Sequence, residues 1–160
     1  MRHRQILTVF LLFTTINLSG QDLFFIGEKS YPCTETIVLI SNKEDSDDLK
    51  ILFAKDDSSK YVAVFTKPKL NSDFTGKLII YLDDGTVIAC ENLIESDFVD
   101  DIAKAVFVLN EKDLSKLKKS NINTVRFTLR VLDLKDVNHS ASNKNSHKTD
   151  FMKIINEFFD

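Results

Sequence analysis

Two short apolar runs joined by Asp84-Gly85 dominate the middle of the chain, in the segment KLIIYLDDGTVIACE that spans residues 77–91. Asp-Gly between apolar runs is the strongest short-range indication of a β-hairpin, because the turn needs residues that adopt positive φ at low cost. A two-residue loop at this point places Leu82 opposite Val87. Both faces of the hairpin are then apolar, so we expect it at the centre of a sheet that is covered on both sides.

Further strands are expected on both sides of this hairpin. Residues 124–132 alternate strictly between apolar and polar side chains, which is typical of a half-exposed antiparallel strand. Other strands are predicted at 34–41, 49–55, 60–66 and 103–109, with a short strand or arm at 23–26. No regular alternation of strands and helices is present, which argues against a parallel sheet. The sequence predicts a mainly β protein, an antiparallel β-sandwich of about seven strands, with an open barrel or an α+β arrangement as the alternative.

One short helix is predicted between the strands at 103–109 and 124–132. Asn110 can cap its N-terminus and Asp113 occupies the third helical position, close to the capping-box pattern. Leu114 and Leu117, three residues apart, give this helix one apolar stripe to bury.

A second helix is predicted at the C-terminus, after a polar segment that reads as a flexible linker. Asp150 can cap this helix, and its apolar residues recur at the spacing of one helical face. These residues are Phe151, Ile154, Ile155 and Phe158. The apolar face either docks onto its own domain or serves as an interaction helix that enters a groove on a partner protein.

The N-terminus has the layout of a secretory signal peptide. Arg2 and Arg4 supply a positive region, and Ile6–Phe13 form an apolar run too short for a comfortable membrane span. We expect cleavage after Gly20, with cleavage after Gln21 or a retained anchor as alternatives, and hence a periplasmic or secreted protein. The predicted parts are a signal peptide at 1–20, a β-rich domain at 21–135, a polar linker at 136–149 and a C-terminal helix at 150–160.

Charge excludes one class of partner. Removing Arg2 and Arg4 from a chain of formal net charge −3 leaves −5, whereas a nucleic-acid surface needs a concentrated positive field. No later stretch is long and apolar enough to be a transmembrane segment. The oligomeric state is not predicted by the sequence.

The two cysteines, Cys33 and Cys90, are predicted to form a disulfide, because an exported domain folds in an oxidising compartment. Closing a loop of this length stabilises by about 4 kcal/mol in the chain-entropy model. The alternative is that both are buried thiols too far apart to bond.

The sequence predicts no catalytic residue, metal site or cofactor. Its histidines are His3 in the predicted signal peptide and His139 and His147 in the predicted linker, so none belongs to the expected core. Preorganised catalysis needs its groups on rigid elements, which argues against a catalytic histidine.

Acidic residues recur in clusters near 44–48, 56–57, 83–84 and 95–101. Carboxylates can coordinate calcium or serve as the acid–base pair of a glycoside hydrolase. Nearly every cluster also falls at an expected turn, where Asp is favoured for its hydrogen bonds to the backbone. We therefore expect these carboxylates to stabilise turns.

The segments KLIIYLDDGTVIAC and DLSKLKKSNINTVRFTL, with the N-terminal segment that ends before Gln21, resemble small exported, uncharacterised β-rich proteins of Bacteroidota. The resemblance covers roughly the middle half of the chain and rests on fold-type patterning. It implies export and a β-rich domain, and it transfers no functional residue.

The sequence therefore favours an exported, non-enzymatic domain that binds a protein or another partner in the cell envelope. A carboxylate-based hydrolase or carbohydrate-active domain and a calcium-binding module are the alternatives.

Overall fold

A computed structural model describes residues 22–44, 46–132, 134–144 and 148–160. The predicted signal peptide at 1–20 lies outside the described residues. The elements are β1 (Asp22–Ile26), β2 (Lys29–Cys33), β3 (Ile37–Ser41), β4 (Leu49–Lys55), β5 (Lys60–Thr66), β6 (Ser72–Leu82), β7 (Val87–Cys90), β8 (Leu93–Val99), β9 (Ile102–Val108), α1 (Glu111–Leu117), β10 (Ile122–Val131), β11 (Lys135–Ser142) and α2 (Phe151–Phe159). The predicted mainly β class is confirmed.

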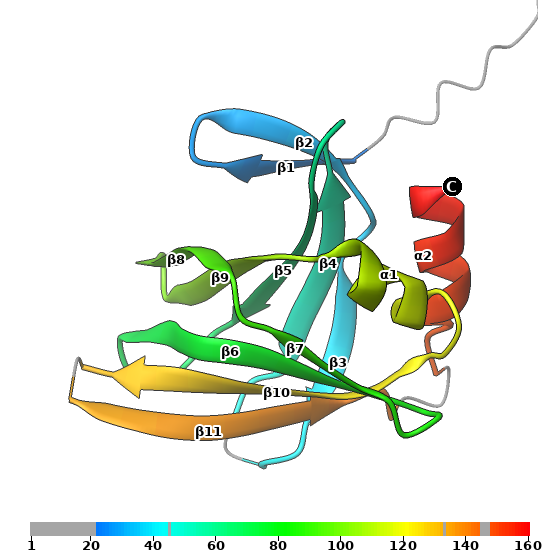
Figure 1. The fold of residues 1–160 in the computed structure, drawn as a ribbon. Helices are drawn as coiled ribbons and strands as arrows, with labels where there is room; N and C mark the ends of the chain where they lie inside the picture. Colours follow the sequence, from blue (N-terminus) through cyan, green and yellow to red (C-terminus); the bar gives the residue numbers. More distant parts are fainter. Residues whose placement is uncertain (1–21, 45, 133, 145–147) are drawn as a thin grey trace, which may run out of the picture.

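The strands form one antiparallel sheet that curls into a nearly closed barrel (Figure 1). Their order is β7-β6-β10-β11-β3-β4-β5-β9-β8, with the β1–β2 hairpin attached to β4 through β2. The ends of this sheet meet where β8 packs against β6, and the Ser96 hydroxyl donates a hydrogen bond to the Phe74 carbonyl at 2.9 Å. The sheet therefore takes the open-barrel form that was the alternative to the sandwich.

Alternating side chains divide the apolar residues between the inside and the outside of the barrel. Ile51 and Phe53 of β4 belong to the large inner core, whereas Leu52 and Ala54 belong to a smaller cluster on the outer face. The β1–β2 hairpin covers this outer cluster with Phe24, whose ring packs edge-on against the ring of Phe65. The outer cluster explains why β4 and β5 are apolar on both faces.

The hairpin at Asp84-Gly85 exists, but its predicted register and position are wrong. Tyr81, and not Leu82, lies opposite Val87, because the loop has three residues and is closed by the Leu82 amide and the Thr86 carbonyl at 2.9 Å. Gly85 adopts φ +85°, as the last residue of such a loop requires.

The shift of one residue reverses the faces of β7. Ile88 and Cys90 enter the inner core beside Ile80, while Val87 is 50% exposed. The strand also lies at one end of the sheet order instead of its centre. One face of β7 is therefore open to water, so this strand is not covered on both sides as predicted.

Helix α1 forms as predicted. The Asn110 side-chain oxygen accepts a hydrogen bond from the Asp113 amide at 2.8 Å, and its amide nitrogen donates to the Asp113 carboxylate at 2.7 Å. Leu114 and Leu117 are buried in the inner core. These local contacts account for the accuracy of this prediction.

Helix α2 docks onto its own domain, which is the first of the two outcomes predicted for its apolar face. Phe151 and Ile155 are completely buried, and Ile154 and Phe158 pack partly buried against the same core. The helix lies beside α1 (Figure 1), where Asn156 donates a hydrogen bond to a backbone carbonyl at the end of α1 at 3.0 Å. None of the described helices is long and apolar enough to cross a membrane.

The predicted linker at 136–149 is wrong over its first half, which forms β11. This strand pairs with β10 along its whole length, and Val137, His139 and Ala141 face inward. The residues between them are polar because they face water and bond to β10, as Asp136 does with Arg130 at 2.8 Å. The polar residues at the outward positions are the reason that the sequence did not predict this strand. His147 lies outside the described residues.

Cys33 and Cys90 are free thiols, so the predicted disulfide is wrong. Cys33 lies in the outer cluster and Cys90 in the inner core. Because the wall of the barrel separates these two clusters, the sulfur atoms belong to opposite faces of the sheet and cannot bond.

Candidate functional site

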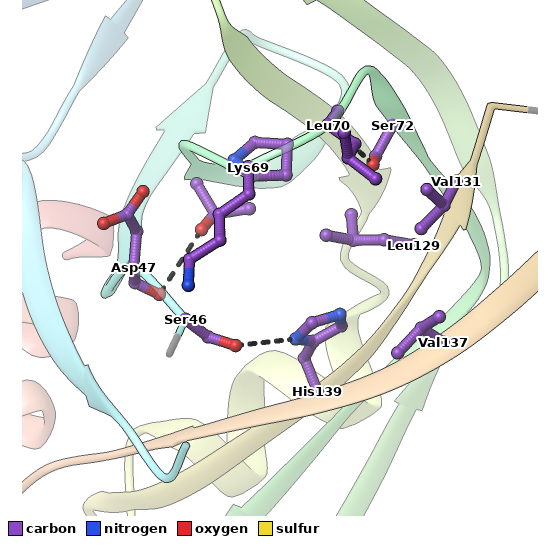
Figure 2. Close-up of a pocket in the computed structure, with 11 residues that line it drawn as sticks. Ser46, Asp47, Lys69, Leu70, Ser72, Leu129, Val131, Val137 and His139 are labelled. Carbon is purple, nitrogen blue, oxygen red and sulfur yellow. Dashed lines mark hydrogen bonds between the residues drawn. The ribbon is translucent and has the colours of Figure 1, made fainter. Parts of the chain in front are cut away.

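The barrel contains a cavity of about 180 Å³ where the β3–β4 loop, the β5–β6 loop, β10 and β11 come together (Figure 2). One of its walls is apolar. The register of β10 and β11 places Leu129 directly opposite Val137, and both side chains point inward. Val131 and Leu70 extend this wall toward the opening.

His139 is the central polar group of the cavity. It lies opposite Phe127 in the sheet, and the two rings stack with their centroids 5.4 Å apart and their planes 15° apart. Its Nδ1 atom is 3.5 Å from the Ser46 hydroxyl. Its second ring nitrogen hydrogen-bonds to none of the described residues, and Figure 2 shows it directed into the cavity.

Burial lowers the pKa of His139, and the positive charge of Lys43 lowers it further. The imidazole is therefore neutral at pH 7 and carries one N–H. If the Ser46 hydroxyl donates to Nδ1, the proton resides on Nε2, which then offers a hydrogen-bond donor to the cavity.

The β3–β4 and β5–β6 loops form the polar rim. The Thr66 hydroxyl donates to the Asp47 carbonyl at 3.5 Å, which joins the two loops. Figure 2 shows the Asp47 carboxylate turned away from His139, and Lys69 also lines this rim.

A second hollow of about 590 Å³ adjoins the first on the other side of Asp47 and Thr66. Phe65 and Ile102 supply its apolar surface. Its charged groups are Asp47, Asp48, Lys50 and Lys67. Two carboxylates face two ammonium groups here, so this hollow selects no particular ligand charge.

Sequence reasoning did not find this site. It placed His139 in a flexible linker and gave no role to Ser46 or Lys69. The pattern that points to the site is Val137-Asn138-His139-Ser140-Ala141, in which every second residue can face a core.

The predicted site residues lie elsewhere. Cys33, Cys90 and the apolar face of α2 line neither hollow. The row of polar side chains on β10 is paired with β11, where Thr128 donates to Asn138 at 2.9 Å and Arg130 bonds Asp136.

Asp56 and Asp84 stabilise turns, as expected, whereas Glu95 and Asp97 of the cluster at 95–101 lie in strand β8. Asp56 accepts hydrogen bonds from the amides of Ser58 at 2.8 Å and Ser59 at 2.6 Å, and these bonds hold its pKa below the usual value. Asp84 accepts from the Thr86 amide at 2.8 Å in the same manner. In the part of the chain that the structure describes, no three His, Cys, Asp or Glu side chains gather as metal ligands would.

Ser46 and His139 do not have the geometry of a catalytic pair. Their separation of 3.5 Å is long for a hydrogen bond, and no carboxylate among the described residues orients the imidazole. The site is suited to hold a small molecule with an apolar body and one polar end.

Comparisons with protein-family models, with curated proteins and with solved structures find no match. The resemblance to exported Bacteroidota proteins therefore stays a prediction.

Proposed function

We propose that this chain is an exported, non-enzymatic binding domain that holds a small molecule in the cavity between β10, β11 and the β3–β4 loop. The observation that carries the proposal is the inward-facing His139, fixed by Phe127 and Ser46 next to an apolar wall. A mostly apolar hollow with a few convergent polar groups is the usual form of a ligand site. Export is proposed from the layout of the N-terminal residues.

This function is better supported than the two alternatives. A glycoside hydrolase needs two carboxyl groups that flank its substrate, whereas Asp47 is the sole carboxylate that lines the cavity among the described residues. A calcium module needs six to eight oxygen ligands around one point. Asp56 and Asp84 instead bond to turn amides, and Asp83 and Asp136 bond to lysine and arginine side chains.

Filling the cavity tests the proposal. Val137→Trp places an indole into the hollow, while Val87→Trp adds the same ring at a half-exposed position of β7. We expect small organic probes to shift the backbone amide NMR signals of β10 and β11 in the native protein and in Val87→Trp. The same probes should leave Val137→Trp unaffected. Equal shifts in all three proteins contradict a site in the cavity.

A protein partner is a second candidate function, which a different surface favours. Strand β1 pairs only with β2 among the described residues, and its Leu23 and Phe25 are 58% and 57% exposed. An exposed edge with apolar side chains is a template for an added strand. The variant Leu23→Ser/Phe25→Ser should lose partners from the cell envelope that Leu134→Ser retains; identical capture by both contradicts this function.

A further inference from the structure

We propose that the ligand of the cavity is a short-chain carboxylic acid in its anionic form, with its carboxylate at His139 and its alkyl chain against Leu129, Val131 and Val137. This inference rests on the proposed binding function and names the chemical class of ligand. Three independent properties of the cavity lead to it: its volume, the hydrogen-bonding group at its polar side, and the balance of charge around it.

Volume limits the length of the ligand. The cavity holds about 180 Å³, and an apolar cavity of about 150 Å³ accommodates benzene. A chain of about four to six carbons therefore fills the cavity, and a longer chain would extend through its opening.

The hydrogen-bonding group favours an acceptor on the ligand. Stacking on Phe127 sets the plane of the His139 ring, and the Ser46 hydroxyl lies 3.5 Å from Nδ1. The nitrogen that faces the cavity is the donor when Ser46 donates to the other nitrogen. A carboxylate accepts hydrogen bonds and donates none, so it matches this donor, and a charge-assisted bond is about twice as strong as a neutral one.

Charge favours an anion over a neutral acceptor. Lys43 comes from the β3–β4 loop, and its ammonium donates to the Asn138 carbonyl at 2.8 Å, one residue from His139. Asp47 turns its carboxylate away from the imidazole (Figure 2). The residues that share the inward face with the ring on β10 and β11, namely Phe127, Leu129 and Val137, carry no charge.

Anion binding also couples to the protonation of His139. A carboxylate next to the ring stabilises the imidazolium form, so binding takes up a proton and strengthens as the pH falls. Burial and the positive charge of Lys43 oppose this protonation, and the other charged groups that line the cavity among the described residues are Asp47 and Lys69. A carboxylate ligand stays largely ionised above about pH 5.5, so the effect is measurable between pH 7.5 and that value.

The test compares three probes of equal length, sodium pentanoate, 1-pentanol and pentylammonium chloride, in amide NMR titrations of the protein. Fragments of this size bind weakly, so each is raised to about 20 mM. We expect pentanoate to shift the amides of Leu129, Val137 and His139, and to bind at least about tenfold more tightly than the other two probes. We also expect tighter pentanoate binding at pH 5.5 than at pH 7.5.

Variants assign the effect to the proposed groups. His139→Phe keeps the ring stacked on Phe127 but removes both nitrogens, and it should weaken pentanoate binding about tenfold or more. Lys43→Ala should weaken it less, and Lys153→Ala, which removes an exposed lysine of α2, should leave it unchanged. Ser46→Ala, on the β3–β4 loop, should also weaken binding, because Nδ1 loses its contact.

The possible failures are distinguishable. If pentanol or pentylammonium binds as well as pentanoate, or if His139→Phe leaves pentanoate binding intact, the carboxylate inference is wrong although the cavity remains a binding site. If no probe shifts the amides around the cavity at any pH tested, both the inference and the proposed binding function are overturned.

Discussion

The strongest structural prediction concerns Ile155, because it decides whether helix α2 belongs to the core. Ile155 is completely buried in the inner core, and the neighbouring turn of the helix contributes Phe151, which is also completely buried. Truncating a fully buried isoleucine to alanine removes its methyl and methylene groups from the core and leaves a cavity, at a cost of about 3 kcal/mol.

The expected change is large enough to measure directly. For a domain of this size, a urea dependence of about 2 kcal/mol/M converts a loss of 3 kcal/mol into a midpoint about 1.5 M lower. Urea unfolding followed by circular dichroism gives this midpoint without a tryptophan, which the chain lacks. Lys153→Ala is the matched control on the same helix, because the Lys153 side chain is 69% exposed, and it should change stability by less than about 0.5 kcal/mol.

The reasoning is refuted if Ile155→Ala unfolds at the same urea concentration as the native protein. In that case α2 contributes no packing energy, and its apolar face is available to another molecule. A loss of about 3 kcal/mol means that the helix is part of the fold.

Cys33 and Cys90 should resist a thiol reagent in the native protein, because burial raises the pKa of both thiols, that of Cys90 to about 12. Both thiols should react after denaturation. Detection of fewer than two thiols in denaturant contradicts the prediction that both cysteines are free. Gly85→Ala should lower the free energy of unfolding by about 1 kcal/mol, because φ is +85° there although no atom lies within 4 Å of the added methyl group; an unchanged urea midpoint argues against the three-residue loop. Burial lowers the pKa of His139 in the folded protein below its ordinary 6.5. The stability that the neutral ring contributes is therefore complete above pH 6.5 and decreases as the pH falls toward the pKa of the folded state. His139→Phe should remove this part of the pH dependence of urea unfolding, and an unchanged profile contradicts the burial of a neutral ring.

The features that were predicted correctly depend on residues close together in the chain. The cap of α1 needs only Asn110 and Asp113, three positions apart, so the sequence contains everything that defines it. The β4–β5 hairpin likewise depends on its own alternation and on the acidic turn between its strands.

The features that were missed depend on distant partners. The register of β6 and β7 could not be read from the sequence, because Asp84-Gly85 suits loops of both lengths and both faces of the hairpin are apolar. Ile88 and Cys90 belong to the same inner core as residues of α1 and β10, so the choice depends on packing with elements outside the hairpin.

The candidate site was missed for a similar reason. His139 has no apolar neighbour in sequence, and its environment is supplied by Phe127 across the ladder and by Ser46 from a loop about ninety residues away. A strand such as β11, whose outward positions are all polar, has a low overall apolar content and is therefore easily taken for a polar linker.

The seam between β3 and β11 has a consequence for how the chain folds. These strands meet only at Ile40–Ser142 and Ser41–Ala141, and the adjoining Asn42 side chain donates to the Ser142 hydroxyl over a separation of 100 residues. Closing a loop of that length costs about 4 kcal/mol of chain entropy beyond a constant term, and folds that depend on such contacts form slowly. The barrel is therefore completed late, after most of the polypeptide is available, and a nascent chain that ends before Ser142 has no partner to close this seam.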